Sequence, residues 1–469
     1  MRLVMKFGGT SVGDGVRVRN AAELVAASAR QGHQVVVAVS AMSGVTDALI
    51  RAARQAAEGD AQTYVSIERA LLEQHLTALA QAVSDPSARG SLRDHVIQGL
   101  DGFVHLCSSI HILGELTPRA LDAVASRGER LVIPILAQVL REQGIQAEPI
   151  EATELVVTDD QFSQASPLMD ETREKTRARL EPLLEAGTVP VVTGFIGATR
   201  TGVTTTLGRG GSDYTATILG SALEADEVWI WTDVNGVMTA DPRVVRDAQT
   251  IEAISYAEAA ELSYFGAKVI HPKTIAPAAE RDTPIRILNT FNPTHPGTWI
   301  VRAPQNNHRN VKAISAIRGL SLITVEGRGM QGIPGVAAKV FSAVAREEIS
   351  VLMISQSSSE QNICFIIEAA AADRARAALD KEFELERLRQ NIDRIWAQER
   401  VVIVAIVGAG MKETAGIAAQ VFNALGARHI NIISIAQGSS EYNLSVAVDE
   451  KDADEAVRAI HAGFGLNAA

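Results

Sequence analysis

The sequence predicts an α/β fold with a mainly parallel sheet, followed by two smaller α/β modules that repeat one another. Three observations support this class. Apolar, β-branched runs such as residues 34–39 alternate with amphipathic helical segments, which is typical of a parallel sheet covered by helices on both faces. Two glycine-rich turns precede expected helices. After a linker near residue 305, the chain repeats itself at a constant offset without a gap.

The elements of the first part follow from hydrophobic periodicity and from the turn signals between them. Prolines 86 and 118 interrupt a mostly helical stretch over residues 50–125, and a threonine-rich hairpin precedes the second glycine-rich turn. The expected strands are residues 2–5, 34–39, 188–192 and 228–231, and the expected helices are residues 16–30, residues 119–141 and a helix that starts at residue 214.

The two glycine-rich turns, KFGGTS at residues 6–11 and LGRGGSD at residues 207–213, are the most informative motifs. Glycine has no Cβ, so adjacent backbone N–H groups can approach an anion closely. Each turn also carries one cation, Lys6 in the first and Arg209 in the second. The second turn opens an expected helix, whose N-terminus favours anions. Together the turns predict that two anionic groups are held at once, which indicates phosphoryl transfer.

Composition excludes several other classes of protein. Apolar residues make up 46% and charged residues 21% of the 469 residues, which fits a globular protein of two to four domains. A net charge of −11 argues against nucleic-acid binding. Two cysteines without a paired motif predict a reducing compartment and no structural metal site. The chain starts in a strand without a signal pattern, and its longest apolar stretch is far too short for a membrane span. We therefore expect a cytoplasmic protein without membrane contact.

The internal repeat predicts two modules of one design. GRGM at residues 327–330 recurs as GAGM at 408–411, ISQ at 354–356 recurs as IAQ at 435–437, and SSE at 358–360 recurs at 439–441. Each copy has the order strand, glycine loop, helix, strand, polar turn, strand, which is a split βαβ pattern. The expected domains are residues 1–303, 312–397 and 398–469, with a C-terminal strand that can complete the first module.

The first copy also contains a glycine pattern that resembles a dinucleotide-binding fingerprint, Gly327-x-Gly329-x-x-Gly332. Three features argue against that function. Glu413 replaces the third glycine in the second copy, and the following strand ends in Gln356 rather than in an acidic residue. The unit is also too short to add the further strands of a dinucleotide-binding half.

Five motifs in order resemble aspartate kinases, and the tandem repeat resembles the ACT domains of that family. The motifs are KFGGTS, SRGER at residues 126–130, TTTLGRGGSDY at 204–214, WTDVNGV at 231–237 and FGAKVIHP at 265–272. The resemblance covers nearly the whole chain. It implies an amino-acid kinase αβα sandwich followed by two βαββαβ ACT domains. It also implies transfer of the γ-phosphoryl group of ATP to the β-carboxylate of L-aspartate, the first step towards lysine, threonine and methionine.

The chemistry of that reaction agrees with the residue types. The attacking carboxylate is already ionised at neutral pH, so no general base is required. Catalysis reduces to alignment and charge neutralisation. Lys6 is expected to neutralise phosphate charge with help from the Gly8 and Gly9 amides. Mg²⁺ is expected to arrive with ATP, because the sequence shows no dedicated metal cage.

The resemblance also assigns binding residues. It implies that Glu129 binds the α-amino group of aspartate and that Arg209 binds the α-carboxylate through two parallel hydrogen bonds. Asp213 is grouped with Lys6 and Arg209 as catalytic, with its role left open. The remaining substrate residues are Ser40, Thr46, Gly210, Gly211 and Ser212. The nucleotide residues are Lys6, Gly8, Gly9, Thr232, Asp233, Met238, Arg243, Lys268 and Val269, of which Met238 departs from the tyrosine that many relatives have.

Two ligand-binding modules suggest feedback inhibition by an amino acid. The expected effector residues are Ile354 and Gln356 in the first copy and Ile435 and Gln437 in the second. Their pattern most resembles threonine-inhibited relatives, many of which are fused to homoserine dehydrogenase, and lysine is the alternative effector. The chain stops at Ala469, so we expect a monofunctional enzyme. Edge-strand pairing between ACT domains predicts a homodimer or a dimer of dimers.

Simpler structural roles compete with these assignments. Glu129 could lie at a solvated corner, Asp233 could cap a turn, and Lys268 could lie at the surface. Gln356 and Gln437 could be ordinary polar residues at strand ends. Two other functions also remain open, a catalytically silent amino-acid sensor and a kinase of the same fold that acts on glutamate or another acceptor.

Overall fold

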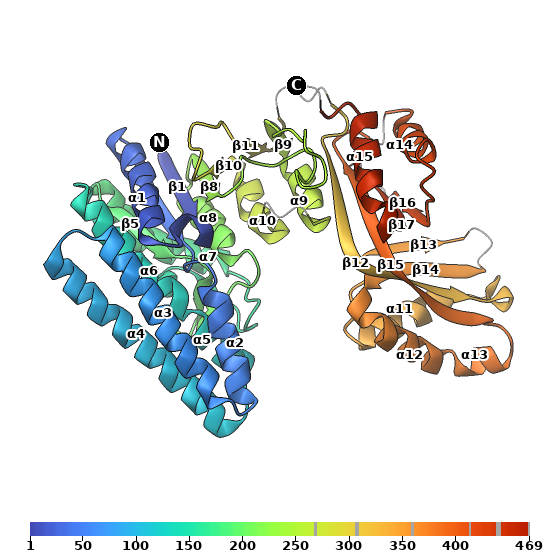
Figure 1. Ribbon diagram of the computed structural model, residues 1–469, viewed down its shortest axis with the longest axis horizontal. Coiled ribbons are helices and arrows are strands. Elements are labelled where there is room, and N and C mark those ends of the chain that lie inside the picture. The colour runs from blue at the N-terminus through green and yellow to red at the C-terminus, as the bar shows by residue number, and fades with distance from the viewer. Residues whose placement is uncertain (267–269, 305–308, 358–360, 412–413, 438–441, 468–469) are drawn as a thin grey trace. The chain divides into compact units, whose positions relative to one another are not determined.

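The computed structural model describes the chain except residues 267–269, 305–308, 358–360, 412–413, 438–441 and 468–469. The described residues form two compact units (Figure 1). The first unit comprises residues 1–237, 250–260 and 268–305, and the second comprises residues 238–249, 261–267 and 306–469. Each unit is described separately.

The first unit is built on an eight-stranded sheet that is parallel except where residues 285–287 pair with residues 298–300. The central strands over residues 2–7 and 34–39 are buried except at their first residues, since both faces of the sheet are covered by helices. The predicted parallel α/β class is therefore confirmed. In spatial order the strands are β3 (Ala147–Ile150), β5 (Val189–Thr193), β2 (Gln34–Val39), β1 (Arg2–Phe7), β8 (Glu227–Thr232), β10 (Ile285–Asn289), β11 (Thr298–Val301) and β9 (Ala253–Ser255).

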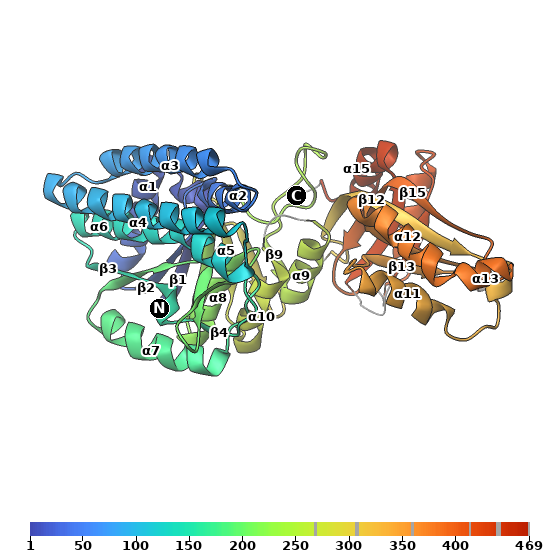
Figure 2. The same cartoon turned by 90° about the horizontal axis from the view of Figure 1, so that it is seen from below.

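Helices cover this sheet in two layers, which Figure 2 shows from the side. One layer contains α1 (Gly15–Arg30), α2 (Val45–Ala57), α3 (Ala61–Ala82), α4 (Pro86–Leu113) and α6 (Arg127–Glu142). The other contains α7 (Met169–Glu185), α8 (Gly211–Ala222) and α10 (Pro272–Arg281). The unit also contains α5 (Pro118–Ala125), the start of α9 (Tyr256–Tyr264), and the short helices η1 (Gly9–Val12) and η2 (Ala152–Glu154).

A small second sheet carries the threonine-rich hairpin. Its strands are β4 (Val157–Thr158), β6 (Ile196–Thr199) and β7 (Thr204–Thr206). The strand β6 is parallel to β4 and antiparallel to β7. The end of β7 leads directly into the second glycine-rich turn, so this sheet places that turn.

Two predicted boundaries differ from the structure. The expected helix over residues 119–141 is broken at Ser126, which ends α5 and precedes α6. The start of α6 lies against the end of β2, where a Cβ on Gly128 would come within 2.7 Å of the Ala41 Cβ. The helix expected from residue 214 begins earlier, at Gly211, because Gly210 adopts a left-handed conformation with φ of 72° and caps it.

Helix α4 is long and apolar enough to cross a membrane by length and composition alone, with a mean hydropathy of 1.3 in its most apolar window. Within the first unit it contacts α2, α3 and α6. Its buried residues, Val96, Leu100, Phe103, Cys107 and Ile110, recur every three or four positions, as expected for a helix with one face against a core.

The second unit is built on one antiparallel six-stranded sheet shared by both repeat copies. In spatial order its strands are β13 (Met353–Gln356), β14 (Asn362–Glu368), β12 (Ala313–Glu326), β15 (Arg394–Val407), β17 (Asn443–Asp449) and β16 (Ser434–Ala436). The long strands β12 and β15 pair along their whole length, with a register irregularity between Ile317 and Leu322. The end of β12 pairs with β14, and the end of β15 pairs with β17.

Each long strand therefore serves both copies. We expected a C-terminal strand to be available to complete the first module. In the described residues the last element is the helix α15 (Ala453–Gly463), and β15 occupies the position beside the end of β12. The two long strands pair in antiparallel fashion, so the first half of β15 lies beside the end of β12, and the first half of β12 lies beside the end of β15. Each copy therefore gains a strand from the other. The boundary at residue 397 lies within β15, and the predicted domain limits remain a prediction.

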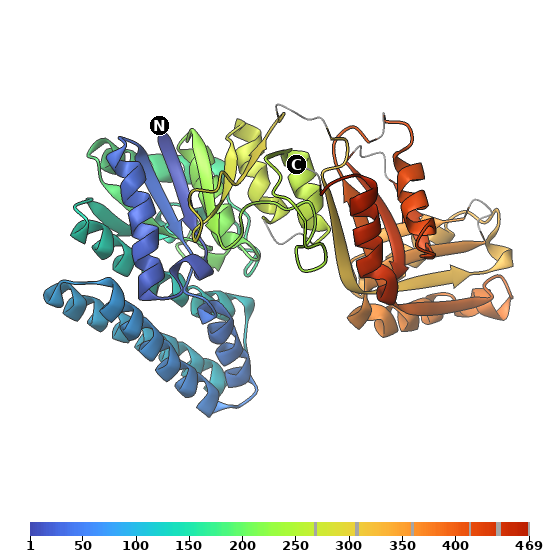
Figure 3. The same cartoon turned by 45° about the horizontal axis from the view of Figure 1, so that its top comes forward.

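The helices of the second unit form two separate cores. The first core contains α11 (Val336–Arg346) and α12 (Ala372–Glu382), and the second contains α14 (Ile417–Gly426) and α15. Figure 3 shows α15 lying along β12 and β15. The short helices of this unit are η3 (Arg328–Met330), η4 (Ala369–Ala371), α13 (Glu384–Leu388) and η5 (Glu450–Asp452).

A segment from the first part of the sequence packs within the second unit, which the sequence did not predict. Ala240 and Val245 are buried in the second core. The Ile314 N–H donates to the Thr239 carbonyl at 2.8 Å, and the Thr239 hydroxyl lies 2.9 Å from His461 Nε2. Residues 238–249 are therefore held by contacts far away in the sequence.

Candidate active site

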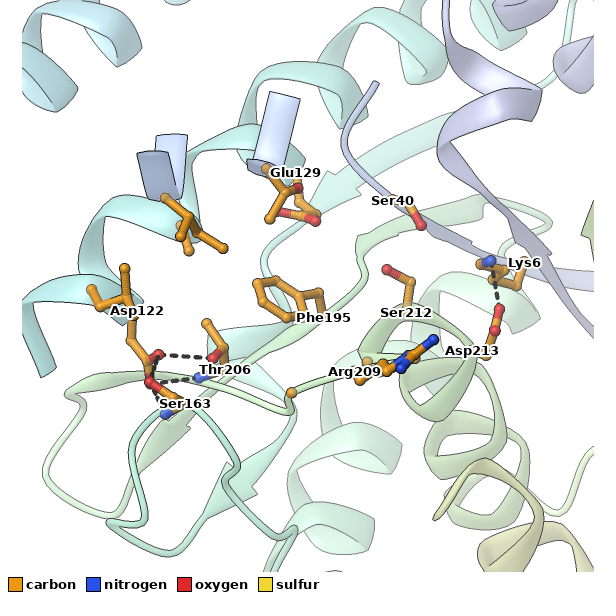
Figure 4. A pocket seen from close by; sticks show the side chains of 17 residues that line it. Lys6, Ser40, Asp122, Glu129, Ser163, Phe195, Thr206, Arg209, Ser212 and Asp213 are labelled. Carbon is orange, nitrogen blue, oxygen red and sulfur yellow. Dashed lines mark hydrogen bonds and ion pairs between the residues drawn. The ribbon is translucent and has the colours of Figure 1, made fainter. Parts of the chain in front are cut away.

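A cavity of about 430 Å³ lies in the first unit, where the ends of β1 and β2 meet the starts of α6 and α8. This volume is typical of a small-ligand site. All nine residues predicted to be catalytic or to bind the substrate line it, and Figure 4 shows most of them. They are Lys6, Ser40, Thr46, Glu129, Arg209, Gly210, Gly211, Ser212 and Asp213.

Lys6 and Asp213 form an ion pair at one side of the cavity (Figure 4). Their closest atoms, Lys6 Nζ and Asp213 Oδ1, are 2.5 Å apart, and the side chains are only 9% and 16% exposed. Lys6 comes from the end of β1 and Asp213 from the first turn of α8. The pair therefore places a cation at the wall of the cavity, where it can neutralise part of the charge of an anionic ligand.

Glu129 is buried in the same cavity with one oxygen unused. The side chain lies in the first turn of α6, and the residue is 2% exposed. Its Oε1 accepts a hydrogen bond from the Ala41 N–H at 3.3 Å, whereas its Oε2 has no hydrogen-bond partner among the described residues. A buried carboxylate oxygen without a partner is costly. The arrangement suits a ligand that brings a positive donor, such as an ammonium group.

Burial also changes the ionisation of this carboxyl group. Desolvation raises the pKa of Glu129 from its ordinary value of 4.5 to about 7, although hydrogen bonds from the backbone and the Arg130 charge act in the opposite direction. The carboxyl group is therefore close to half-protonated at neutral pH before a ligand binds. A bound ammonium group stabilises the ionised form, so such a ligand expels the proton.

Arg209 projects from the second glycine-rich turn and is exposed. Among the described residues it has no hydrogen bond or ion pair. Gly208 and Gly210 flank it in left-handed conformations, with φ of 76° and 72°. A Cβ on Gly210 would come within 2.7 Å of His271 Cβ. Burial and then the Lys273 and Arg209 charges lower the pKa of His271. Arg209 therefore keeps its whole guanidinium available for an anionic ligand.

The predicted nucleotide residues fall into three groups. Thr232 ends β8, which lies parallel to β1, so that Thr232 and Asp233 are at the same sheet edge as Gly8 and Gly9. The Gly8 N–H donates to the Trp231 carbonyl at 3.3 Å. That N–H is engaged in the sheet, so the expected phosphate cradle loses one of its two amide donors.

The other predicted nucleotide residues belong to the second unit or lie outside the described residues. Met238 and Arg243 belong to the second unit, and the Arg243 guanidinium is paired with Asp241, its Nη2 lying 2.6 Å from the Asp241 Oδ2. Lys268 and Val269 lie outside the described residues. Among the described residues no group of three His, Cys, Asp or Glu side chains is placed to hold a metal ion.

The four predicted effector residues do not line one common cavity among the described residues. Gln356 lines a cavity of about 310 Å³ at the start of α11, together with Gly332 and Gly335. Ile354 lines a different cavity, together with Ala436. Ile435 is 42% exposed and Gln437 is also exposed. The corresponding cavity in the second copy is about 410 Å³ and is lined by Arg309, Gly416, Gln420 and neighbouring residues, with Gln437 absent from its described lining.

The model of the amino acid kinase family matches residues 1–289, which is more than half of the chain. The chain belongs to the amino acid kinase family. The model of the ACT domain matches residues 323–383 and 404–464, so this kinase-family chain carries two ACT domains that share one sheet, and the predicted fold is confirmed.

Individual relatives narrow the family to aspartokinases. The bifunctional aspartokinase/homoserine dehydrogenase 2 of Arabidopsis thaliana, a chloroplastic protein, is 36% identical over 470 residues, which cover 99% of this chain and 51% of the relative. The chain thus spans about half the length of that relative. Chloroplastic aspartokinase 2 of the same plant is 32% identical over 468 residues, covering 98% of this chain and 84% of the relative.

Solved structures agree with these relatives. Escherichia coli aspartokinase III in complex with aspartate and ADP matches with a TM-score of 0.82 and 31% identity, covering 99% of each chain. The same enzyme in complex with lysine and aspartate matches with a TM-score of 0.79 and 31% identity, covering 98% of this chain and 99% of the other.

Eight residues besides the nine predicted ones line the cavity of this aspartokinase-family chain. Asp122, Ser163 and Phe195 belong to no recognised motif, yet all three face the cavity of Lys6 and Glu129. Ser163 and Phe195 adopt left-handed conformations with φ of 69° and 68°, which residues other than glycine rarely do. The backbone conformation marks Ser163 and Phe195, and long-range hydrogen bonds mark Asp122. A sequence displays neither feature.

Proposed function

We propose that the chain is an aspartate kinase that transfers the γ-phosphoryl group of ATP, supplied with Mg²⁺, to the β-carboxylate of L-aspartate. The observation that carries the proposal is that one cavity is lined by both the buried Glu129 carboxylate and the Arg209 guanidinium. Among the described residues, one oxygen of Glu129 and the whole guanidinium of Arg209 have no partner. These two groups complement the ammonium and α-carboxylate of an amino acid. The aspartate and ADP bound to the E. coli relative support this assignment.

The ion pair of Lys6 and Asp213 is the third charged group of the cavity, and it is assigned to the transfer of the phosphoryl group. A β-carboxylate oxygen forms a bond to the γ-phosphorus while the bond from that phosphorus to the β,γ-bridging oxygen breaks, so that ADP leaves. No proton has to move, because the carboxylate is ionised. Lys6 neutralises the charge on the phosphoryl oxygens, and Asp213 holds Lys6 in place through their ion pair. Ser40 and Ser212 line the cavity beside them and can position the carboxylate.

The test is acyl-phosphate formation, trapped with hydroxylamine and dependent on both ATP and Mg²⁺, with L-aspartate and L-glutamate as alternative acceptors. Faster turnover of aspartate supports the proposal, and faster turnover of glutamate replaces it by a glutamate kinase. The absence of turnover with any acidic amino acid, together with retained amino-acid binding, identifies a sensor that kept the fold.

Replacing Arg209 by alanine is expected to raise the KM for aspartate and to lower turnover by on the order of 10²-fold or more, since a preorganised charge is lost. The KM for ATP should change little, because Arg209 is assigned to the amino acid. Steady-state kinetics with each substrate varied in turn provide the measurement. Arg200→Ala is a matched control, because this arginine lies on the β6–β7 hairpin and pairs with Glu171 instead of lining the cavity. A normal aspartate KM in Arg209→Ala removes the assigned role.

We further propose that an amino acid bound at the ACT domains inhibits the kinase, with threonine as the first candidate and lysine as the alternative. Lysine bound to the E. coli relative supports an amino-acid effector of this kind. A homodimer or a dimer of dimers through the ACT domains, and a cytoplasmic location, remain parts of this proposal. Native mass spectrometry with and without each amino acid measures the oligomeric state.

Gln356→Ala is expected to raise the inhibitor concentration for half-inhibition at least tenfold and to leave the uninhibited rate unchanged, because Gln356 lines the α11 cavity and its amide can donate and accept. Gln437→Ala is the matched variant in the second copy. Relief in Gln437→Ala alone assigns the effector to the second copy, and normal inhibition in both variants removes the two glutamines from the effector site.

A further inference from the structure

Two buried carboxylates line the cavity, and their bonding differs completely. Asp122, in α5, is 1% exposed. Its Oδ2 accepts the N–H groups of Ser163 at 2.8 Å and of Thr206 at 2.9 Å. Its Oδ1 accepts the hydroxyls of Ser163 at 3.2 Å and of Thr206 at 2.8 Å. Figure 4 shows this cluster at the end of the cavity away from Lys6.

The different hydrogen bonding of Asp122 and Glu129 indicates different roles for the two carboxylates. A carboxylate offers about four lone-pair sites, and the four hydrogen bonds of Asp122 occupy that number. Asp122 therefore has little capacity left for a ligand, whereas Glu129 retains an unpartnered oxygen. Glu129 is suited to contact a substrate, and Asp122 is suited to hold protein segments together.

The segments that Asp122 joins lead to the turn of Arg209. Thr206 ends β7, and Arg209 follows three residues later. Ser163 lies in the loop after β4, where the Ala165 N–H donates to the Thr206 carbonyl at 2.9 Å. A Cβ on Gly208 would come within 3.1 Å of the Ser163 carbonyl oxygen. The Ser163 loop therefore packs against the turn that carries Arg209.

We propose that Asp122 is a positioning residue for the amino-acid site. Its four hydrogen bonds hold Ser163 in its left-handed conformation against Thr206, and this clamp fixes the start of the turn from Leu207 to Gly210. Arg209 is exposed and lacks its own ion pair among the described residues, so its placement depends on the backbone beneath it. A displaced guanidinium binds the α-carboxylate poorly. This inference rests on the proposed assignment of Arg209 to aspartate.

The test is Asp122→Asn in the full chain, with two readouts. The asparagine has the same shape, but it carries no charge and only one of its two amide atoms accepts, so it cannot accept all four hydrogen bonds of the carboxylate. We expect the KM for aspartate to rise by about tenfold to 10²-fold, with little change in the KM for ATP. We also expect trypsin to cleave after Arg209 at least ten times faster, as measured by mass spectrometry of the fragments. Cleavage does not depend on catalysis.

Two further variants keep the test decisive. Ser163→Ala removes one of the four hydrogen bonds, and we expect an intermediate effect on both readouts even if Asp122→Asn fails to fold. Glu142→Gln is the control, because the Glu142 carboxylate also clamps backbone N–H groups, those of Ser84 and Asp85, but does not line the cavity. Neither readout should change in that control.

The possible results separate the positioning role of Asp122 from the proposed kinase activity. A raised aspartate KM with faster cleavage after Arg209 supports the positioning role. A lower melting temperature with general cleavage and an unchanged aspartate KM means that Asp122 serves stability alone, which overturns it. If the wild-type chain lacks aspartate kinase activity, the proposed function fails, and unchanged cleavage after Arg209 in Asp122→Asn then overturns the clamp as well.

Discussion

Replacing Glu129 by glutamine is expected to remove most of the aspartate affinity and at the same time to make the protein more stable. The amide cannot supply the negative charge that the α-amino group needs in a buried site. Losing one partner of a desolvated charge pair costs about 2–5 kcal/mol of binding. This range corresponds to an increase in the aspartate KM of on the order of 10²-fold or more.

The stability gain follows from the pKa of the same group. Because burial raises the pKa of Glu129 from 4.5 to about 7, ionisation opposes folding. The cost is absent below pH 4.5, grows as the pH rises, and is complete above pH 7. At about 1.4 kcal/mol per pH unit, it reaches roughly 3 kcal/mol. Glutamine does not ionise, so the free energy of unfolding should increase by about that amount at pH 8 and little at pH 4.5.

Denaturant unfolding at the two pH values measures this gain. Glu142→Gln provides a control on the same helix with the opposite sign, since backbone hydrogen bonds from Asp85 and Ser84 contribute to a lowered pKa of Glu142. That variant should lose stability or leave it unchanged at pH 8. Equal unfolding free energies for Glu129→Gln and the wild type at pH 8 contradict the buried, ionisable state of Glu129.

The pH dependence of the wild-type kinetics provides a second test of Glu129. Because aspartate binds the ionised form, its KM should rise as the pH falls below about 7, approaching tenfold for each pH unit. The dependence should disappear in Glu129→Gln. A flat aspartate KM between pH 8 and pH 6 in the wild type argues against contact between Glu129 and the ammonium group.

Replacing Lys6 by methionine is expected to lower kcat by on the order of 10³-fold, because a preorganised positive charge near the transferred phosphoryl group is lost. The KM for aspartate should change far less. The substitution also leaves the Asp213 carboxylate without its partner. The loss is costly because the side chains of Lys6 and Asp213 are only 9% and 16% exposed. The folded state should therefore lose up to about 3 kcal/mol.

The double variant Lys6→Met with Asp213→Asn separates these two effects. Removing the unpaired carboxylate should restore most of the stability, as measured by denaturant unfolding, while kcat stays low. If kcat also recovers in the double variant, Lys6 acts only as the structural partner of Asp213 and has no role at the phosphoryl group.

Local sequence patterns predicted much of the fold and of the site. The apolar run of β2 was predicted with its observed bounds, since a buried parallel strand reads as a continuous β-branched run. Lys6, Arg209 and Asp213, which the two glycine-rich turns single out, line one cavity. Both turns depend on glycine for backbone approach, which is a property visible in the residue type itself.

The features that no local pattern predicted share one property, contact between residues far apart in the sequence. Asp122 bonds to partners 41 and 84 positions away, and no local pattern marks such an acid. The segment with Ala240 and Val245 belongs to the second unit because these two apolar side chains are buried in its second core. The shared use of β12 and β15 also depends on pairing over a distance of many residues.

The sequence by itself determined the fold class, the repeat and the chemical types of the charged groups, because these depend on periodicity and on residue identity. Tertiary structure alone decided how each group is used. Glu129 and Asp122 are both acids, and burial with an unpartnered oxygen makes one suited to a ligand while four hydrogen bonds make the other an anchor. Desolvation and hydrogen bonding depend on which atoms come together in space, and only the folded chain brings them together.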